Sequence, residues 1–278
     1  MKSHCIKPLL LGFLVMLSAG TRSSGAVTTV AWYRCGEEDI NSAAGETPGK
    51  PTDIAIATTG SNLTHEAINN TGNIEWSAST PGSLPLANST LCYHSKGRNA
   101  VYGSLILSQS DNFGVEAWVK PTVAAEGAWC TLNGQSNSEL GEHSGFGIFK
   151  DGGFWQIHFP GIVVSKYSSN EASVHIGEWQ HVAVVRDSAT FGTRLYVNGV
   201  LVGHIENIPN EPSPAGGTML LGNATEPGDS PSPDGGQYFT GGLDEVRYFT
   251  FNSGEFIEPT VNHLNQVTAS GDLNIPVK

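Results

Sequence analysis

The chain has 278 residues, of which 26 are acidic and 14 are lysine or arginine, so its formal net charge at pH 7 is −12. A chain of this charge repels nucleic-acid phosphates and anionic lipid head groups, which argues against both as partners. Glycine occurs 34 times and proline 15 times, a composition that predicts many turns and few long helices.

The first 26 residues have the pattern of a cleaved secretory signal peptide. Lys2 and Lys7 make a basic start, an apolar run follows from Leu9 to Leu17, and small residues come next. A membrane-spanning helix needs about 20 apolar residues, far more than this run provides, and no later segment is longer. We therefore expect a secreted, periplasmic or cell-surface protein with no membrane span in the mature chain.

Short runs of strand-forming residues follow one another between turn signals over residues 27–255. Asn198-Gly199 between two such runs predicts a type I′ hairpin turn, because both residues tolerate a positive φ. Many short strands without helices predict an all-β fold, a two-sheet antiparallel sandwich. The expected strands are 28–34, 113–120, 145–150, 154–159, 180–186, 194–197, 200–205, 218–221 and 243–249.

Two segments lack this pattern. Residues 40–89 are rich in Ser, Thr, Asn, Gly and Pro, and we expect long polar loops there with edge strands at 53–57 and 73–76. Residues 256–278 hold few apolar side chains and are expected to form a C-terminal tail.

Three cysteines remain once the signal peptide is removed: Cys35, Cys92 and Cys130. Export permits a disulfide, but three cysteines allow only one bridge and leave an odd thiol. One disulfide with a buried thiol and three buried thiols both remain open. The spacing contains no metal-binding Cys/His cluster, so no zinc site is expected.

Three blocks, in this order, resemble the laminin-G-like domains of bacterial exported proteins. The first block is residues 113–121, which end in Trp118-Val119-Lys120-Pro121. The second is residues 177–185, with Trp179-Gln180-His181-Val182-Ala183, and it leads into Leu195-Tyr196-Val197-Asn198-Gly199. The third is residues 239–248, with Gly242-Leu243-Asp244-Glu245-Val246-Arg247. The resemblance implies the concanavalin A-like jelly roll, two antiparallel sheets packed face to face with the first strand beside the last. It does not extend over residues 40–89.

Enzymes of this fold that cut β-glucans carry a Glu-x-Asp-x-Glu strand, whose two glutamates act as nucleophile and acid/base. The nearest match is Glu37-x-Asp39-x-Asn41, where Asn41 is an amide that can neither protonate a leaving group nor attack. We therefore predict no catalytic residue. The alternative is a glycoside hydrolase or lyase with an acid pair that does not follow this pattern.

The acids at the two ends of the domain suggest a metal site. Calcium prefers several carboxylate and carbonyl oxygens. If the first and last strands pair, Glu37 and Asp39 come close to Asp244, which predicts a structural calcium ion there. The alternative is that Asp244 bonds backbone amides at the start of its strand. No other cofactor is expected.

Aromatic side chains next to polar ones are typical of carbohydrate sites, because sugar rings stack on the aromatic faces. By the two-residue period of a strand, Trp118, Gln156 and His158 lie opposite the expected core positions and are the predicted ligand-binding residues. The alternative is that Trp118 packs inside the sandwich. His181 is predicted to be a buried histidine, with a role as ligand or base as its alternative. The leading hypothesis is an exported, non-catalytic module that binds a polysaccharide or glycan, or an extracellular protein. A purely structural or adhesive surface component is a further alternative.

Overall fold

The computed structural model describes fifteen segments of the chain. These are residues 27–36, 43–45, 53–54, 63–66, 74–82, 89–97, 100–104, 112–125, 127–133, 145–159, 162–163, 172–187, 192–205, 218–222 and 238–253. They contain sixteen strands and no α-helix, in accord with the expected all-β class. No helix in this part of the chain is long and apolar enough to cross a membrane. The predicted signal peptide, Glu37 and Asp39 lie outside the described residues.

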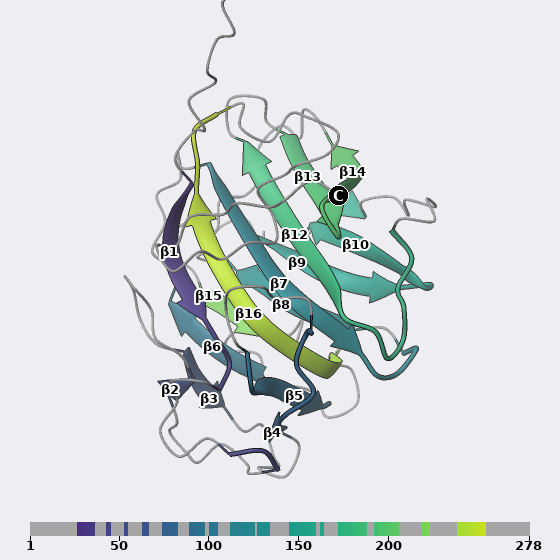
Figure 1. Cartoon of the computed structure of the whole chain (residues 1–278). Helices are drawn as coiled ribbons and strands as arrows, with labels where there is room; N and C mark the ends of the chain where they lie inside the picture. Colours follow the sequence, from purple (N-terminus) through teal and green to yellow (C-terminus); the bar gives the residue numbers. More distant parts are fainter. Residues whose placement is uncertain are drawn as a thin grey trace, which may run out of the picture.

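The strands form two antiparallel sheets of eight strands each (Figure 1). Sheet A has the order β14 (Val200–Ile205), β13 (Gly192–Val197), β12 (Gln180–Asp187), β7 (Phe113–Pro121), β16 (Thr240–Thr250), β5 (Cys92–Lys96) and β4 (Ile74–Ser77), with β1 (Thr28–Tyr33) also on β16. Sheet B has the order β11 (Ile162–Val163), β10 (Phe154–Phe159), β9 (Gly145–Asp151), β8 (Gly127–Asn133), β15 (Thr218–Leu221), β6 (Ala100–Ser104), β3 (Leu63–Glu66) and β2 (Asp53–Ile54).

The last strand, β16, lies at the centre of sheet A. It pairs with β7 along one edge and with β1 and β5 along the other, so the expected contact between the first and last strands is confirmed. A bulge between Asp244 and Arg247 interrupts its register with β7. Glu245, inside that bulge, has a φ of 50°, which is rare for a residue with a side chain.

The main core lies between the two sheets. Val115, Ala117 and Val119 of β7 enter it from sheet A, and Trp155 and Ile157 of β10 enter it from sheet B. All five are at most 1% exposed, which confirms the predicted core faces of these two strands. The hairpin turn is also as predicted, because Asn198 and Gly199 have φ values of 51° and 79°.

Half of the outer face of sheet A is also buried. Ala183, Val185, Tyr196 and Phe249 alternate with core residues along their strands, and yet they are fully buried in a second apolar cluster. Toward the other end of the sheet, where β7 ends and β16 begins, the outer-face residues Trp118, Lys120 and His94 are half-buried. Asp244 and His181, which flank Trp118 on this face, are buried. The open part of this face is therefore confined to β4, β5 and the adjoining ends of β16, β7 and β12.

Candidate functional site

The three predicted ligand-binding residues do not share one groove. Trp118 lies on β7 and points to the outer face of sheet A, since its neighbours Ala117 and Val119 are in the core. Gln156 lies on β10 of sheet B, points away from the core and is 1% exposed. His158 is on the same strand, and its side chain lies outside the described residues. Because the core separates the two outer faces, Trp118 and Gln156 face opposite sides of the sandwich.

A row of polar and aromatic residues crosses the open part of sheet A beside Trp118. The strand register places Glu75 of β4 opposite His94 of β5, His94 opposite Gly242 of β16, and Gly242 opposite Lys120 of β7. Trp179 comes opposite Lys120, because the next residue of β12, Gln180, pairs with Val119. We call these five residues the polar row. Their strands lie side by side in the front sheet of Figure 1.

The indole of Trp179 fills the space that Gly242 leaves open. A Cβ atom placed on Gly242 would lie 2.7 Å from Trp179 Cη2 and 3.1 Å from Cζ2. The ring therefore extends from β12 across β7 and lies on the backbone of β16. It is half-buried, so one part of the indole remains accessible to solvent at the centre of the row.

Gln180 fixes the start of β12 and with it the position of Trp179. Its amide oxygen accepts hydrogen bonds from Trp155 Nε1 at 3.2 Å and from the His175 backbone N–H at 2.8 Å. Its amide nitrogen donates to the Ser173 carbonyl oxygen at 2.8 Å. The buried amide thus ties the turn before β12 to a tryptophan of the opposite sheet.

Charged groups occupy the β4–β5 end of the row. Glu75 lies 2.6 Å from Lys96 Nζ and 3.4 Å from His94 Nδ1. The hydrogen bond from Lys96 lowers the pKa of Glu75, so this carboxylate stays ionised. Burial, with the nearby lysine charges, lowers the pKa of His94, although Glu75 opposes the shift. On the other side of Gly242, Lys120 Nζ donates to Ser79 Oγ at 3.0 Å.

Trp118 contacts His181, which belongs to a buried cluster with Glu116 and Arg247. Its ring meets His181 edge to face at 5.5 Å between centroids. His181 Nε2 lies 3.2 Å from Glu116 Oε2, and Arg247 Nε donates to Glu116 Oε1 at 2.7 Å. His181 is therefore buried, as predicted, while Trp118 remains half-buried on the outer face and does not enter the sandwich core.

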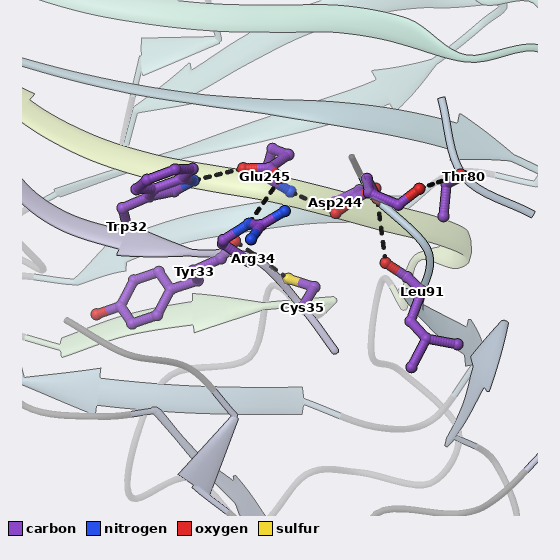
Figure 2. A network of polar contacts seen from close by, with 9 residues as sticks. Trp32, Tyr33, Arg34, Cys35, Thr80, Leu91, Asp244 and Glu245 are labelled. Atoms are coloured by element: carbon purple, nitrogen blue, oxygen red, sulfur yellow. Dashed lines mark hydrogen bonds and ion pairs between the residues drawn. The ribbon is translucent and has the colours of Figure 1, made fainter. Parts of the chain in front are cut away.

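Asp244, the predicted calcium ligand, is fully buried in a network of hydrogen bonds (Figure 2). Ser89 Oγ donates to its Oδ2 at 2.5 Å, and the Glu245 backbone N–H donates to its Oδ1 at 2.8 Å. The second contact is a hydrogen bond to a backbone amide, which the sequence offered as the alternative to calcium binding. No group of three metal-binding side chains occurs among the described residues. Calcium at Asp244 remains a prediction.

Glu245 belongs to the same network, and its carboxylate faces β1 (Figure 2). It accepts hydrogen bonds from Trp32 Nε1 at 2.5 Å and from Arg34 Nε at 3.3 Å. The Arg34 guanidinium also lies over the Trp32 ring, 5.6 Å from its centroid. These contacts join the first strand to the bulge of the last one and explain why the strained conformation of Glu245 is kept.

The three cysteines are buried thiols. Cys35 Sγ lies 3.5 Å from the Tyr33 carbonyl oxygen, and Cys92 Sγ lies 3.5 Å from that of Ser79. Burial raises the pKa of Cys130, so its reactive thiolate form is disfavoured. Of the two alternatives that the sequence left open, the structure therefore has three buried thiols and no disulfide among these cysteines.

Adding a methyl group at position 242 is expected to displace the Trp179 ring. In Gly242→Ala the new Cβ would overlap the tip of the indole, which can turn aside, so the free energy of unfolding should change by at most about 1 kcal/mol. Acrylamide quenching of tryptophan fluorescence should increase, with Trp179→Phe identifying the contribution of this ring among the 6 tryptophans. Unchanged quenching would contradict the position of the ring.

Two eight-stranded antiparallel sheets, packed face to face around one core, define a β-sandwich protein. Residues 95–252 match the family described as the Concanavalin A-like lectin/glucanases superfamily, and the chain belongs to that superfamily. The resemblance of the three sequence blocks is thereby confirmed. The match includes Lys120, Trp179 and Gly242, whereas Glu75 and His94 precede it.

Several solved structures resemble this one at low sequence identity. Domain 4 of an extracellular arabinanase from Geobacillus stearothermophilus, in complex with arabinotriose, is 16% identical, with a TM-score of 0.48 over 82% of this chain and 95% of that one. A ligand-binding domain of botulinum neurotoxin serotype D with N-acetylneuraminic acid is 12% identical, with a TM-score of 0.48 over 82% and 48%. The IT-sialidase CBM40 of Ruminococcus gnavus is 12% identical, with a TM-score of 0.40 over 51% and 77%. No curated protein matches the chain in sequence.

Proposed function

We propose that the protein is an exported, non-catalytic module that binds carbohydrate on the polar row and Trp118. The observation that carries the proposal is the half-buried indole of Trp179, whose tip lies against Gly242, the residue between His94 and Lys120 in the row. An aromatic face takes the apolar face of a sugar ring, and charged or polar side chains beside it bond the hydroxyls. Membership of a superfamily described by its lectins and glucanases supports the same ligand class.

The carboxylates on this face of sheet A support a function in binding without catalysis. Hydrolysis of a glycosidic bond by the usual mechanisms needs two carboxyl groups on either side of the bond. The row holds one carboxylate, Glu75, which is engaged by Lys96 and His94. Glu116, on the same face, is 2% exposed and bound to Arg247. A glycoside hydrolase or lyase with an acid pair elsewhere is the alternative.

Replacing Trp179 by alanine is expected to weaken carbohydrate binding about tenfold, equivalent to about 1.4 kcal/mol. The probes are insoluble xylan, cellulose and chitin, with depletion of the protein from solution as the measurement and released reducing sugar measured in parallel. Ile176→Ala is the matched control, since Ile176 is 46% exposed in the turn before β12 but lies outside the row. Sugar release would favour the enzyme, and equal depletion by both variants would overturn the site.

One observation favours a protein partner as the second candidate. Val123, Ile176 and Val200 are the exposed large apolar side chains of the described segments, at 39%, 46% and 38%. All three lie at the same end of sheet A: Val123 follows the end of β7, Ile176 is in the turn before β12, and Val200 is the first residue of β14. Capture of a surface protein that is lost on Ile176→Asp and kept on Trp179→Ala would favour this candidate.

A further inference from the structure

Two lysines, Lys96 and Lys120, lie on the open part of sheet A of a strongly acidic protein. The formal net charge of the chain is −12, with 26 acidic side chains against 14 basic ones. On the open part of sheet A, Lys96 and Lys120 are accompanied by the half-buried carboxylate of Glu75 and by Asp244, which is buried and hydrogen-bonded to Ser89 and to the Glu245 backbone N–H. A lysine that is not paired with a carboxylate can select for an anionic group on a negative molecule, since the rest of the surface repels polyanions.

The two lysines differ in what compensates their charge. Lys96 Nζ is 2.6 Å from Glu75 Oε2, and the other oxygen of that carboxylate is 3.4 Å from His94 Nδ1. Lys120 Nζ instead donates to the hydroxyl of Ser79 at 3.0 Å, a neutral partner. Among the residues that the structure describes, no carboxylate is paired with the ammonium of Lys120. The ammonium can bind one while keeping or exchanging the hydroxyl.

The position of Lys120 in the sheet brings its ammonium group near the indole ring of Trp179. Lys120 is paired with Gly242 on one side and stands opposite Trp179 on the other. The indole that rests on Gly242 thus passes next to the root of the Lys120 side chain. A sugar ring stacked on the accessible part of this indole would bring a substituent within reach of Nζ, because the lysine side chain is long and flexible.

We propose that the ligand is an acidic glycan, with the carboxylate or sulfate of one residue bound by Lys120 next to the sugar ring stacked on Trp179. This rests on the proposed carbohydrate-binding function. Carboxylate and sulfate offer the same anionic oxygens to an ammonium group, so both are included. An acidic protein segment could engage the lysine but would not use the indole in the same way.

The test compares polymers that differ only in charge, by affinity electrophoresis of the purified protein. One arm uses polygalacturonate against its methyl ester, and the other uses dextran sulfate against dextran. The charged member of at least one pair should bind at least tenfold more tightly in 50 mM NaCl, and 500 mM NaCl should remove most of the difference. The pair that responds identifies carboxylate or sulfate as the group bound.

Lys120→Gln is expected to lose this preference and to keep the residual binding of the neutral polymer, while Trp179→Ala should weaken both. Lys96→Gln is the matched control and should lose less than Lys120→Gln, since Glu75 already compensates Lys96. Equal binding of charged and neutral members, or an unchanged preference in Lys120→Gln, would overturn the inference and leave the carbohydrate site standing. Competition by polyglutamate that persists in Trp179→Ala would overturn it in favour of an acidic protein. Failure on every polysaccharide would overturn both proposals.

Discussion

Replacing Glu116 by glutamine is expected to lower the free energy of unfolding by about 3–5 kcal/mol, the usual cost of breaking a buried ion pair. Arg247 is 0% exposed and its Nε bonds Glu116 Oε1 at 2.7 Å. Glutamine has nearly the same volume as glutamate, so no cavity forms and the loss reports the charge. The guanidinium would remain buried without the carboxylate that balances it.

The pH dependence gives a second readout of the same pair. Burial alone would raise the pKa of Glu116, but the Arg247 charge and the His181 contact outweigh it and lower the pKa from its ordinary value of 4.5. A lowered folded-state pKa stabilises the protein above the unfolded value, and the gain is lost as pH falls through the folded value. The difference between wild type and Glu116→Gln should therefore be largest at neutral pH and shrink below about pH 4.5.

Urea denaturation at neutral pH measures the loss. Glu75→Gln is the control, because a surface ion pair of this kind contributes only about 0–1 kcal/mol. A Glu116→Leu/Arg247→Met double variant removes both charges and should recover most of the loss of the single variant. A double variant no more stable than Glu116→Gln would show that the pair itself is not what the single substitution breaks.

Alanine at position 241 is expected to cost about 3–5 kcal/mol, from backbone strain and overpacking together. Gly241 has a φ of 148°, and a Cβ there would lie 2.1 Å from the Lys120 carbonyl oxygen. That oxygen belongs to the neighbouring strand in the middle of sheet A, so neither group can move without breaking the β7–β16 pairing. The neighbouring Gly242 meets only the tip of a side chain, and its substitution should be much milder.

Gly82→Ala is the matched control for this prediction, because nothing lies within 4 Å of a Cβ placed on Gly82. Urea denaturation of the three alanine variants should rank them with Gly241→Ala far below Gly242→Ala and Gly82→Ala. If Gly242→Ala and Gly82→Ala yield folded protein and Gly241→Ala does not, the result supports the same ranking. Gly241→Ala within about 1 kcal/mol of wild type would contradict the close approach, given that most substitutions at unconstrained surface sites stay within about 0.5 kcal/mol.

The sequence was sufficient to predict the sandwich, the hairpin and the core faces of the strongest strands. Val115, Ala117 and Val119 alternate so regularly that one face of β7 had to be buried. The same rule did not reveal β5, Cys92–Lys96, because it contains no β-branched residue and carries polar side chains at three of its positions. Its pairing with β16, some 150 residues later, supplies the stability that its own residues lack.

The candidate site was predicted only in part, for two physical reasons. Alternation shows that Trp118 and Gln156 point away from a core, but it does not show to which sheet each strand belongs. The polar row is assembled from five strands far apart in the sequence, so only the register brings Glu75, Lys120 and Trp179 together. Lys120 and Trp179 each lie in a block of the family resemblance, but the blocks do not show that the two residues come together, and Glu75 lies in none of them.

The central position of β16 in sheet A affects how the protein folds during its synthesis. This strand pairs with β1, β5 and β7 and supplies Gly242 to the row, so sheet A and its outer surface cannot be completed until residues 240–250 have left the ribosome. Contacts this far apart in sequence are slow to form. If the protein is exported as proposed, a chain that cannot close early would stay open for passage through a secretion channel, and the proposed binding surface would be completed after that passage.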